Sequence, residues 1–412
     1  MKLLFIHQNM PGQFKHLVPL LVGAGHEVVF LTKQKTLQIK GVRKLVYTPH
    51  RQVRPSTHHY MRQFENGLLH GQGVARLCQQ LAQEGFRPDL VIAHPGWGEA
   101  LFVKETFPRT PLINYCEFYY SATGTDFGFD PAVAVTFDDQ CRIRARNAHL
   151  LLSLELCDRG WSPTQWQKSR HPTAYRDKID VVFDGVDTYL ARPNAQARFA
   201  LPSGQVLTPR DEVITYVARN LEPYRGFTTF MRALPDLLKA RPKAQVVIAG
   251  ATGVSYGAAP KGGGTWKDVL VEEAGLGALP AAKERVHFVG HLAYERYLAL
   301  LQVSSAHIYL TYPFVLSWSF MEAMATGCLM IGSDTAPVRE VLKDGENGWL
   351  TDFFDSGRLV ETVVRALDSP DAGRLRAAAR ASIVGRYDLQ TCLPVQLELI
   401  EKTSGLPILA KP

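Results

Sequence analysis

The chain has 412 residues, which is too long for one core and suits two domains of roughly 150 to 200 residues each. With 46% hydrophobic and 21% charged residues and no apolar run of about 20 residues, the composition is that of a globular enzyme and excludes a membrane span. The net charge is +7, and residues 1–185 carry most of the surplus, with 22 Lys and Arg against 16 Asp and Glu. This surplus predicts an anionic partner (a phosphorylated substrate, nucleic acid or an anionic lipid surface) or, as the plain alternative, a solvated basic face.

The first half alternates short apolar runs with helical patterns. Strands are expected at 2–8, 26–32, 88–94 and 111–117, helices at 12–25 and 75–86, and the series continues at 148–156 and 178–186. Near-continuous apolar strands separated by helices predict a parallel sheet covered on both faces. The opening strand is only five residues long before His7, so we expect no signal peptide.

A Pro-, Ala- and Arg-containing stretch at 191–211 is predicted to be a linker, and a second α/β series follows it. We therefore predict an α/β protein of two doubly wound, Rossmann-like domains that face a central cleft. The predicted boundaries are 1–190 for the first domain, 212–385 for the second, and 386–412 for a C-terminal helix that packs back on the first. One long helix is expected over about 371–404. Ligands in such sheets bind beyond the carboxyl ends of the strands.

Several classes of site are disfavoured by the motifs. The six cysteines are scattered without metal-ligand spacing, which predicts a reduced cytoplasmic protein without structural zinc. There is no G-x-x-x-x-G-K-[ST] motif, and the first strand–helix turn has one glycine where a dinucleotide fingerprint has three. NAD enzymes and P-loop NTPases are therefore not expected.

Four segments, in order and correctly spaced, resemble the retaining glycosyltransferases of family 4, which have the GT-B fold. They are "NMPGQFKHLVPLLVGAGHEV" (9–28), "VVFDGVDTYLARP" (181–193), "VARNLEPYRGFTTFMRAL" (217–234) and "MEAMATGCLMIGSDTAPVREVLKDGENGWL" (321–350). The resemblance implies transfer of a sugar from a nucleoside diphosphate sugar with retained configuration. An enzyme that does this without a metal must supply cations and helix-terminal amides to the leaving diphosphate.

The resemblance assigns the donor side to the second domain. Arg219 and Arg225 match the diphosphate-binding Arg and Lys, and Glu322 matches the glutamate that binds the ribose hydroxyls. Phe314 stands where the family has the first of its two glutamates, the one that binds the transferred sugar. We therefore expect backbone amides of Leu316, Ser317 and Trp318 to hold the phosphate and sugar. The plain alternatives are a surface arginine pair and a glutamate that only serves the start of its helix.

The first domain is expected to supply Gly12, His94 and Glu117. Gly12 matches the glycine that lies against the diphosphate and the transferred sugar, and His94 follows a strand and so faces the cleft. Glu117 aligns with a position where many family members carry a histidine over the reacting sugar. Together with Arg219 and Arg225, His94 and Glu117 are the catalytic candidates; a structural role is the alternative for each.

The acceptor side is predicted to include the basic stretch 48–67, with Arg51, Arg54, His58 and Arg62. It suits a saccharide or lipid-linked acceptor, or peripheral contact with an anionic membrane at the inner face of the cytoplasmic membrane. A solvated basic loop is an equal alternative, and no nucleic-acid-binding module is visible.

The prediction is a cytoplasmic glycosyltransferase that uses a UDP- or GDP-linked sugar and needs no cofactor or metal. The alternatives are a catalytically inactive nucleotide-sugar-binding subunit and a nucleotide-sugar epimerase of the same fold. The donor base, the sugar, the acceptor and the oligomeric state are left open.

Overall fold

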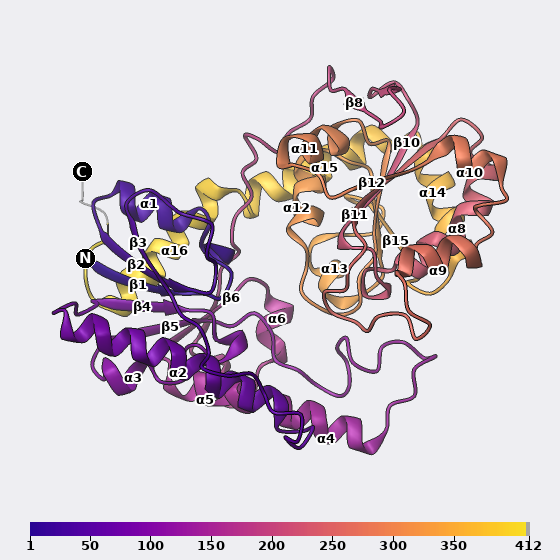
Figure 1. Cartoon of the computed structure of the whole chain (residues 1–412). Helices are drawn as coiled ribbons and strands as arrows, with labels where there is room; N and C mark the ends of the chain where they lie inside the picture. The colour runs from indigo at the N-terminus through magenta and orange to yellow at the C-terminus, as the bar shows by residue number, and fades with distance from the viewer. Residues whose placement is uncertain (409–412) are drawn as a thin grey trace. The chain divides into compact units, whose positions relative to one another are not determined.

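The computed structural model describes residues 1–408 and divides into two compact units (Figure 1). Unit 1 comprises Met1–Gly185 together with the chain from Gln390 onward, and unit 2 comprises Val186–Leu389. The first unit thus ends five residues before the predicted boundary at 190. Of the segment predicted at 386–412, residues 386–389 belong to unit 2, and 409–412 lie outside the described residues.

The sheet of unit 1 has seven parallel strands in the order β3-β2-β1-β4-β5-β6-β7. Their bounds are β1 Lys2–Ile6, β2 Glu27–Thr32, β3 Val42–Val46, β4 Leu90–Ala93, β5 Leu112–Tyr115, β6 Arg159–Ser162 and β7 Ile179–Val181. Side chains of one strand alternate between two cores. Leu3 and Phe5 pack on one face with α1 (Leu17–Gly23) and α16 (Leu389–Ser404), and Leu4 and Ile6 pack on the other.

The other helices of unit 1 lie on the second face or around the ends of the strands (Figure 1). They are the 3₁₀ helices η1 Gly12–Phe14 and η2 Pro95–Trp97, and α2 Arg62–Gln83, α3 Val103–Thr106, α4 Phe137–Arg146, α5 Ala148–Leu156, α6 Gln165–Arg170 and α7 Thr173–Arg176. Helix α2 begins inside the stretch that the sequence analysis treats as a basic loop, so Arg62 is its first residue.

The sheet of unit 2 has six parallel strands in the order β12-β11-β10-β13-β14-β15. Their bounds are β10 Val213–Asn220, β11 Gln245–Ala251, β12 Val286–Gly290, β13 Ala306–Tyr309, β14 Met330–Ser333 and β15 Trp349–Thr351. Figure 1 shows helices on both sides of this sheet. The helices are η3 Pro223–Arg225, α8 Phe227–Ala240, α9 Trp266–Glu273, α10 Pro280–Arg285, α11 Tyr294–Gln302, α12 Trp318–Ala325, α13 Ala336–Val341, α14 Ser356–Asp368 and α15 Ala372–Arg386.

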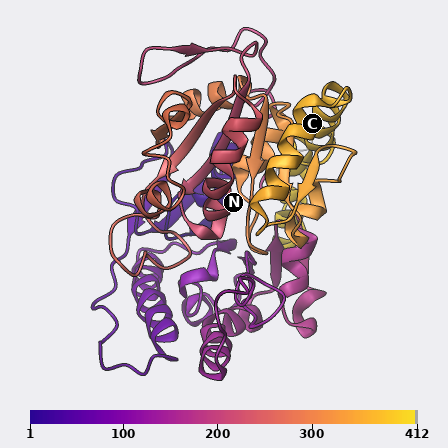
Figure 2. The same ribbon diagram turned by 90° about the vertical axis from the view of Figure 1, so that its right-hand side faces the viewer.

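The predicted linker at 191–211 is wrong, because this stretch is an integral part of unit 2. It forms a small antiparallel hairpin, β8 (Phe199–Ala200) and β9 (Val206–Leu207), near the top of Figure 2. Phe199 and Leu207 are buried in a core cluster that also contains Val213 of β10. The Pro and Ala content of the stretch is typical of a linker, but its buried Phe199 and Leu207 anchor it to the core of unit 2.

The predicted single helix at 371–404 is also wrong, because α15 ends at Arg386 and α16 begins at Leu389. Between them the backbone pairs with Val186: the Val186 amide donates to the Tyr387 carbonyl at 2.7 Å, and the Leu389 amide donates to the Val186 carbonyl at 3.0 Å. A hydroxyl–carboxylate bond from Thr188 to Asp388 adds to this pairing. Backbone groups engaged in this way cannot continue a helical ladder.

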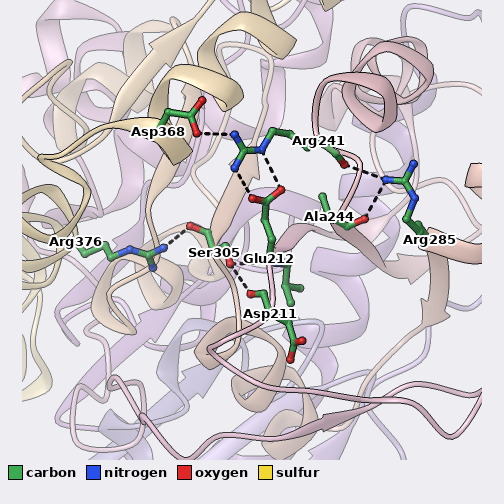
Figure 3. Close-up of polar contacts among 9 residues, drawn as sticks. Asp211, Glu212, Arg241, Ala244, Arg285, Ser305, Asp368 and Arg376 are labelled. Atoms are coloured by element: carbon green, nitrogen blue, oxygen red, sulfur yellow. Dashed lines mark hydrogen bonds and ion pairs between the residues drawn. The ribbon is translucent and has the colours of Figure 1, made fainter.

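Arg241 fixes the amino-terminal end of β10 in the unit 2 sheet (Figure 3). Its guanidinium bonds to both carboxylate oxygens of Glu212, just before β10, and donates to Asp368 at the end of α14 at 2.6 Å. Hydrogen bonding to Glu212 raises the pKa of Arg241 despite partial burial. A two-pronged arginine–carboxylate pair of this kind gives both attraction and orientation. It anchors β10 at the end remote from the candidate site.

Candidate active site

Each sheet has a point where the strand order reverses, and the predicted site residues gather there. In unit 1 the neighbours β1 and β4 lead into His7 and His94. In unit 2 Arg219 is the penultimate residue of β10, and the neighbouring β13 leads into the loop 310–317. The crevice beyond such a reversal is where ligands bind in open α/β sheets.

The two predicted diphosphate-binding arginines have different surroundings. Arg219, near the end of β10, is exposed and forms no hydrogen bond or ion pair within residues 1–408. Arg225 is buried, and its Nη1 donates to Thr311 Oγ1 at 2.7 Å and to the Val315 carbonyl at 3.1 Å. Arg219 is therefore the cation free to meet a ligand, whereas Arg225 also shapes the loop 310–317.

Gly226 allows Arg225 to reach this loop. Its φ is +68°, and a Cβ there would lie 2.2 Å from the Leu310 Cβ. Only glycine accepts that conformation and that approach without strain. The close approach brings η3 against the end of β13, so that the guanidinium of Arg225 lies within bonding distance of Thr311 and Val315.

The backbone amides expected to hold the phosphate are partly engaged. Tyr309 Oη lies 3.3 Å from Arg225 Nη1 and accepts from the Ser317 amide at 2.9 Å. The prediction for Ser317 is thus corrected, because its amide already has a partner. The Leu316 side chain is buried, and Trp318 opens α12.

Phe314 is buried in an aromatic cluster. Its ring is 5.1 Å from that of Tyr256 and 5.7 Å from that of Tyr224, in edge-to-face contacts, and Tyr224 stacks on Tyr312 at 4.6 Å. Edge-to-face aromatic pairs add about 0.5–1.5 kcal/mol to the stabilisation from burial alone. Tyr256 also lies over the Arg225 guanidinium at 5.1 Å.

A carboxylate that the sequence analysis did not single out, Glu222, holds Tyr256 in this cluster. Glu222 has no exposed surface, and its oxygens accept the backbone amides of Ser255, Tyr256 and Gly257 at 3.1–3.2 Å. Its only sequence signal is an acidic residue immediately before the proline of η3, between the two arginines.

Glu322 lies in α12, and only 7% of its surface is exposed. Its Oε1 accepts the Tyr294 hydroxyl and its Oε2 the Tyr297 hydroxyl, both at 2.9 Å. The two tyrosines lie one turn apart on α11 and were not predicted. Glu322 therefore does more than serve the start of its helix.

In unit 1 a chain of hydrogen bonds runs from the Asn9 amide through His7 and Gln13 to Glu117. The Asn9 amide donates to His7 Nδ1 at 2.9 Å, so the ring proton of neutral His7 is on Nε2, which donates to Gln13 Oε1 at 2.7 Å. Gln13 Nε2 in turn donates to Glu117 Oε1 at 2.8 Å. Burial, followed by the neighbouring His94, lowers the pKa of His7 to about 3. His7 and Gln13 are thus neutral groups that orient Glu117.

His94 is buried and caps η2, where its Nδ1 accepts the Gly96 amide at 3.1 Å. Its Nε2, which carries the proton in the neutral ring, lies 3.5 Å from Glu117 Oε2. The two residues also line a small cavity of about 40 Å³, room for about one water molecule. His94 and Glu117 thus form one polar cluster, and the predicted role of His94 at the cleft stays a prediction.

Gly12 has a structural reason to be glycine. Its φ is +56°, and a Cβ there would lie 2.3 Å from His7 Nε2. Any other residue would displace the His7 ring and break its bond to Gln13. Packing against His7 is therefore enough to require glycine at position 12. The diphosphate-binding role that the resemblance implies for Gly12 stays a prediction.

The acceptor-side residues do not form one charged cluster. Arg51 pairs with Glu65 at 2.6 Å, and Arg62 donates to the carbonyls of Thr57 and Pro55 at 3.2 and 3.1 Å. His58 stacks on His59. Arg54 is exposed and, with Arg62, lines an open surface groove.

Residues 1–408 contain neither a preformed cluster of metal ligands nor a helix suited to span a membrane. In this part of the chain, no group of three or more His, Cys, Asp or Glu side chains is arranged to hold a metal ion. None of its helices combines the length and the apolar character that a membrane-spanning segment requires.

Comparisons with known proteins agree over most of the chain. Residues 24–191 match the model described as "Glycosyl transferase family 4 group", and residues 202–382 match "Glycosyl transferases group 1". Glycogen synthase of Mycobacterium tuberculosis is 29% identical over 52% of this chain and 46% of its own length. D-inositol 3-phosphate glycosyltransferase of Rhodococcus jostii is 29% identical over 52% of this chain and 44% of its own. The matches thus span about half the length of these curated relatives.

Solved structures show the same fold over the whole chain. HepE of Anabaena, in complex with UDP and glucose, has a TM-score of 0.66 at 17% identity and covers 98% of this chain and 100% of its own. Sucrose-phosphate synthase of Thermosynechococcus elongatus has a TM-score of 0.70 at 17% identity over 98% of both chains. With its two parallel-sheet units and its matches to both models, the chain belongs to the GT-B glycosyltransferases that these models describe.

Proposed function

We propose that the protein transfers a sugar from a nucleoside diphosphate sugar, UDP- or GDP-linked, to a hydroxyl acceptor. The observation that carries this proposal is the arrangement in unit 2, where Arg219, Arg225 and Glu322 follow the reversal point of one sheet. Two cations suit a leaving diphosphate, and a carboxylate suits the two ribose hydroxyls. Retention of configuration is part of the proposal and rests on the family resemblance.

The comparisons support the nucleotide-sugar donor. HepE binds UDP and glucose in its crystal structure, and the curated relatives carry the names of glycosyl-transferring enzymes. At 17% identity the HepE structure is a guide to the fold, so the base and the sugar need a direct test. Radiolabelled UDP-, GDP- and ADP-sugars should each be incubated with the protein, and donor hydrolysis and transfer to saccharide acceptors should be measured. Absence of turnover with every donor would refute the proposal.

We further propose that the reaction needs no metal, because arginine cations take the place of a metal beside the diphosphate. Turnover should then be unchanged within about twofold in excess EDTA. Loss of turnover that manganese restores would contradict a metal-free mechanism.

The acceptor is proposed to be a saccharide or a lipid-linked sugar reached at the cytoplasmic face of a membrane. The exposed Arg54 and the groove it lines with Arg62 support an anionic partner on unit 1. Co-sedimentation with vesicles that contain about one-third anionic lipid should exceed that with neutral vesicles, and the excess should fall at high salt. Equal sedimentation with both would remove the membrane from this proposal.

A second candidate function, a nucleotide-sugar-binding subunit without turnover, is favoured by one observation. Phe314 replaces a carboxylate and is held in an aromatic cluster with Tyr224 and Tyr256. This candidate predicts that a donor binds in calorimetry while hydrolysis and transfer stay at the level of the buffer control. Turnover above that level excludes it.

A further inference from the structure

The two tyrosines on Glu322 have different surroundings, although each gives one hydroxyl to one carboxylate oxygen. Tyr294 is the first residue of α11 and is 43% exposed. Tyr297 is half-buried one turn further on, and its hydroxyl also lies 3.5 Å from the Ser319 carbonyl. Burial, followed by the nearby charge of Glu322, raises the pKa of both hydroxyls, so both are protonated donors at neutral pH.

The charge of Glu322 is held by these neutral donors. Within residues 1–408 no Lys, Arg or His forms an ion pair with Glu322. A carboxylate has about four lone-pair sites, and the two tyrosines use two of them. A buried carboxylate that is only partly satisfied favours any further O–H donor that reaches it.

We propose that Tyr297 is a fixed positioning residue for Glu322, and that Tyr294 is a displaceable one that competes with a ribose hydroxyl for Oε1. This inference rests on the proposed function, in which Glu322 binds the ribose of the donor. Tyr297 is less exposed, and its hydroxyl contacts both the Glu322 carboxylate and the Ser319 carbonyl of α12, so its movement would break two contacts. Tyr294 can rotate toward solvent, where water replaces its bond to Glu322.

Opposite effects follow for two chemically identical substitutions. Tyr297→Phe removes the donor that orients Glu322, so nucleoside diphosphate should bind about tenfold more weakly, as expected for loss of a bond to a charged group. Tyr294→Phe removes a competitor, so binding should be about twofold to fivefold tighter, because water still competes for Oε1.

The experiment is a titration calorimetry cycle with the full chain. UDP, GDP and ADP are titrated into the unaltered protein, and the tightest is compared with its 2′-deoxy and 3′-deoxy forms. In the unaltered protein, removal of either the 2′- or the 3′-hydroxyl, whichever one Glu322 binds, should weaken binding about tenfold or more. In Tyr297→Phe the same loss should cost less than about threefold, because Glu322 no longer meets that hydroxyl in the correct orientation. A purely structural role would weaken the ribose and deoxyribose forms equally.

Tyr189→Phe is the matched control, because Tyr189 is 74% exposed and does not contact Glu322. Its Kd should equal that of the unaltered protein. Effects of the same sign in Tyr294→Phe and Tyr297→Phe, or an unchanged ribose-to-deoxyribose ratio in Tyr297→Phe, overturn the inference and leave the proposed function standing. Failure of UDP, GDP and ADP to bind the unaltered protein overturns both.

Discussion

Replacing Glu222 by Ala should release the segment 255–257 from unit 2 while the rest of the unit stays folded. The buried carboxylate of Glu222 accepts all three backbone amides of this segment. Hydrogen bonds to a charged group contribute about 1.5–3 kcal/mol each, so the three are worth about 4.5–9 kcal/mol. Fixing three residues costs about 3–6 kcal/mol of backbone entropy. Taken at mid-range, about 7 kcal/mol of hydrogen bonding against about 4.5 kcal/mol of backbone entropy, the segment is held closed by about 2 kcal/mol.

Amide hydrogen exchange measures this free energy directly. Because each 1.4 kcal/mol is a factor of ten, the amides of Ser255, Tyr256 and Gly257 should exchange about 10 to 150 times faster in Glu222→Ala. The freed amides lie at the surface and can bind water, so the free energy of unfolding should fall by only about 1–3 kcal/mol. Glu272→Ala is a suitable control, because Glu272 is an exposed glutamate in α9 of the same unit.

The reasoning fails if exchange at 255–257 is the same in Glu222→Ala as in the Glu272→Ala control. It also fails if exchange quickens equally throughout unit 2, since Glu222 would then stabilise the whole core rather than this segment. Release of Tyr256 should also expose Phe314 and uncover Arg225, because the Tyr256 ring contacts both. An increase in the solvent accessibility of Phe314 is therefore a second, independent readout.

Arg219→Ala and Arg225→Ala should each lower turnover about 10²- to 10³-fold, by analogy with donors to a developing oxyanion. Only Arg225→Ala should also lower the free energy of unfolding in denaturant, by about 2–4 kcal/mol, because it leaves buried acceptors unpaired; equal stability of the two variants would contradict this. Phe314→Glu should lower both activity and stability, the latter by about 2–5 kcal/mol in chemical denaturation, because it buries a charge in an aromatic cluster; unchanged stability would contradict that placement. Burial lowers the pKa of His307 to about 3, so its contribution to stability is complete above about pH 6.5 and is lost as the pH falls toward 3. Denaturation of His307→Gln between pH 6 and 4 should therefore show a slope of stability against pH that is smaller by about 1.4 kcal/mol per pH unit, and an identical slope would mean that His307 does not titrate as inferred.

The fold could be predicted because parallel strands buried on both faces leave a strong pattern. All the residues of β4, β5, β13 and β14 are buried, and each strand is a short, mostly apolar run set off by loops and helices. The failures lie where distant backbone groups pair. The break between α15 and α16 depends on Val186, some 200 residues earlier, and no local pattern reports such a contact.

The charged residues of the site could be predicted from the sequence, but the residues that hydrogen-bond to them could not. Arg219, Arg225 and Glu322 stand in recognisable segments, but the hydroxyls on Glu322 come from a helix 25 and 28 residues away. A tyrosine on an amphipathic helix looks the same in sequence whether its hydroxyl meets water or a carboxylate. Which of these holds is decided by tertiary packing alone.

The aromatic residue at 314 and the hydrogen bonds of Arg225 together leave the Arg225 guanidinium without a negatively charged partner among the described residues. Phe314 and the Arg225 guanidinium both contact the Tyr256 ring, so a carboxylate at 314 would bring a negative charge near the guanidinium. Instead, Arg225 donates to a carbonyl and hydroxyls, and within residues 1–408 neither Arg225 nor Arg219 forms an ion pair. Uncharged acceptors fix the guanidinium in place without cancelling its charge. Two uncompensated cations at the reversal point of one sheet attract a diphosphate more strongly than a neutralised pair does, and this supports the proposed transfer without a metal.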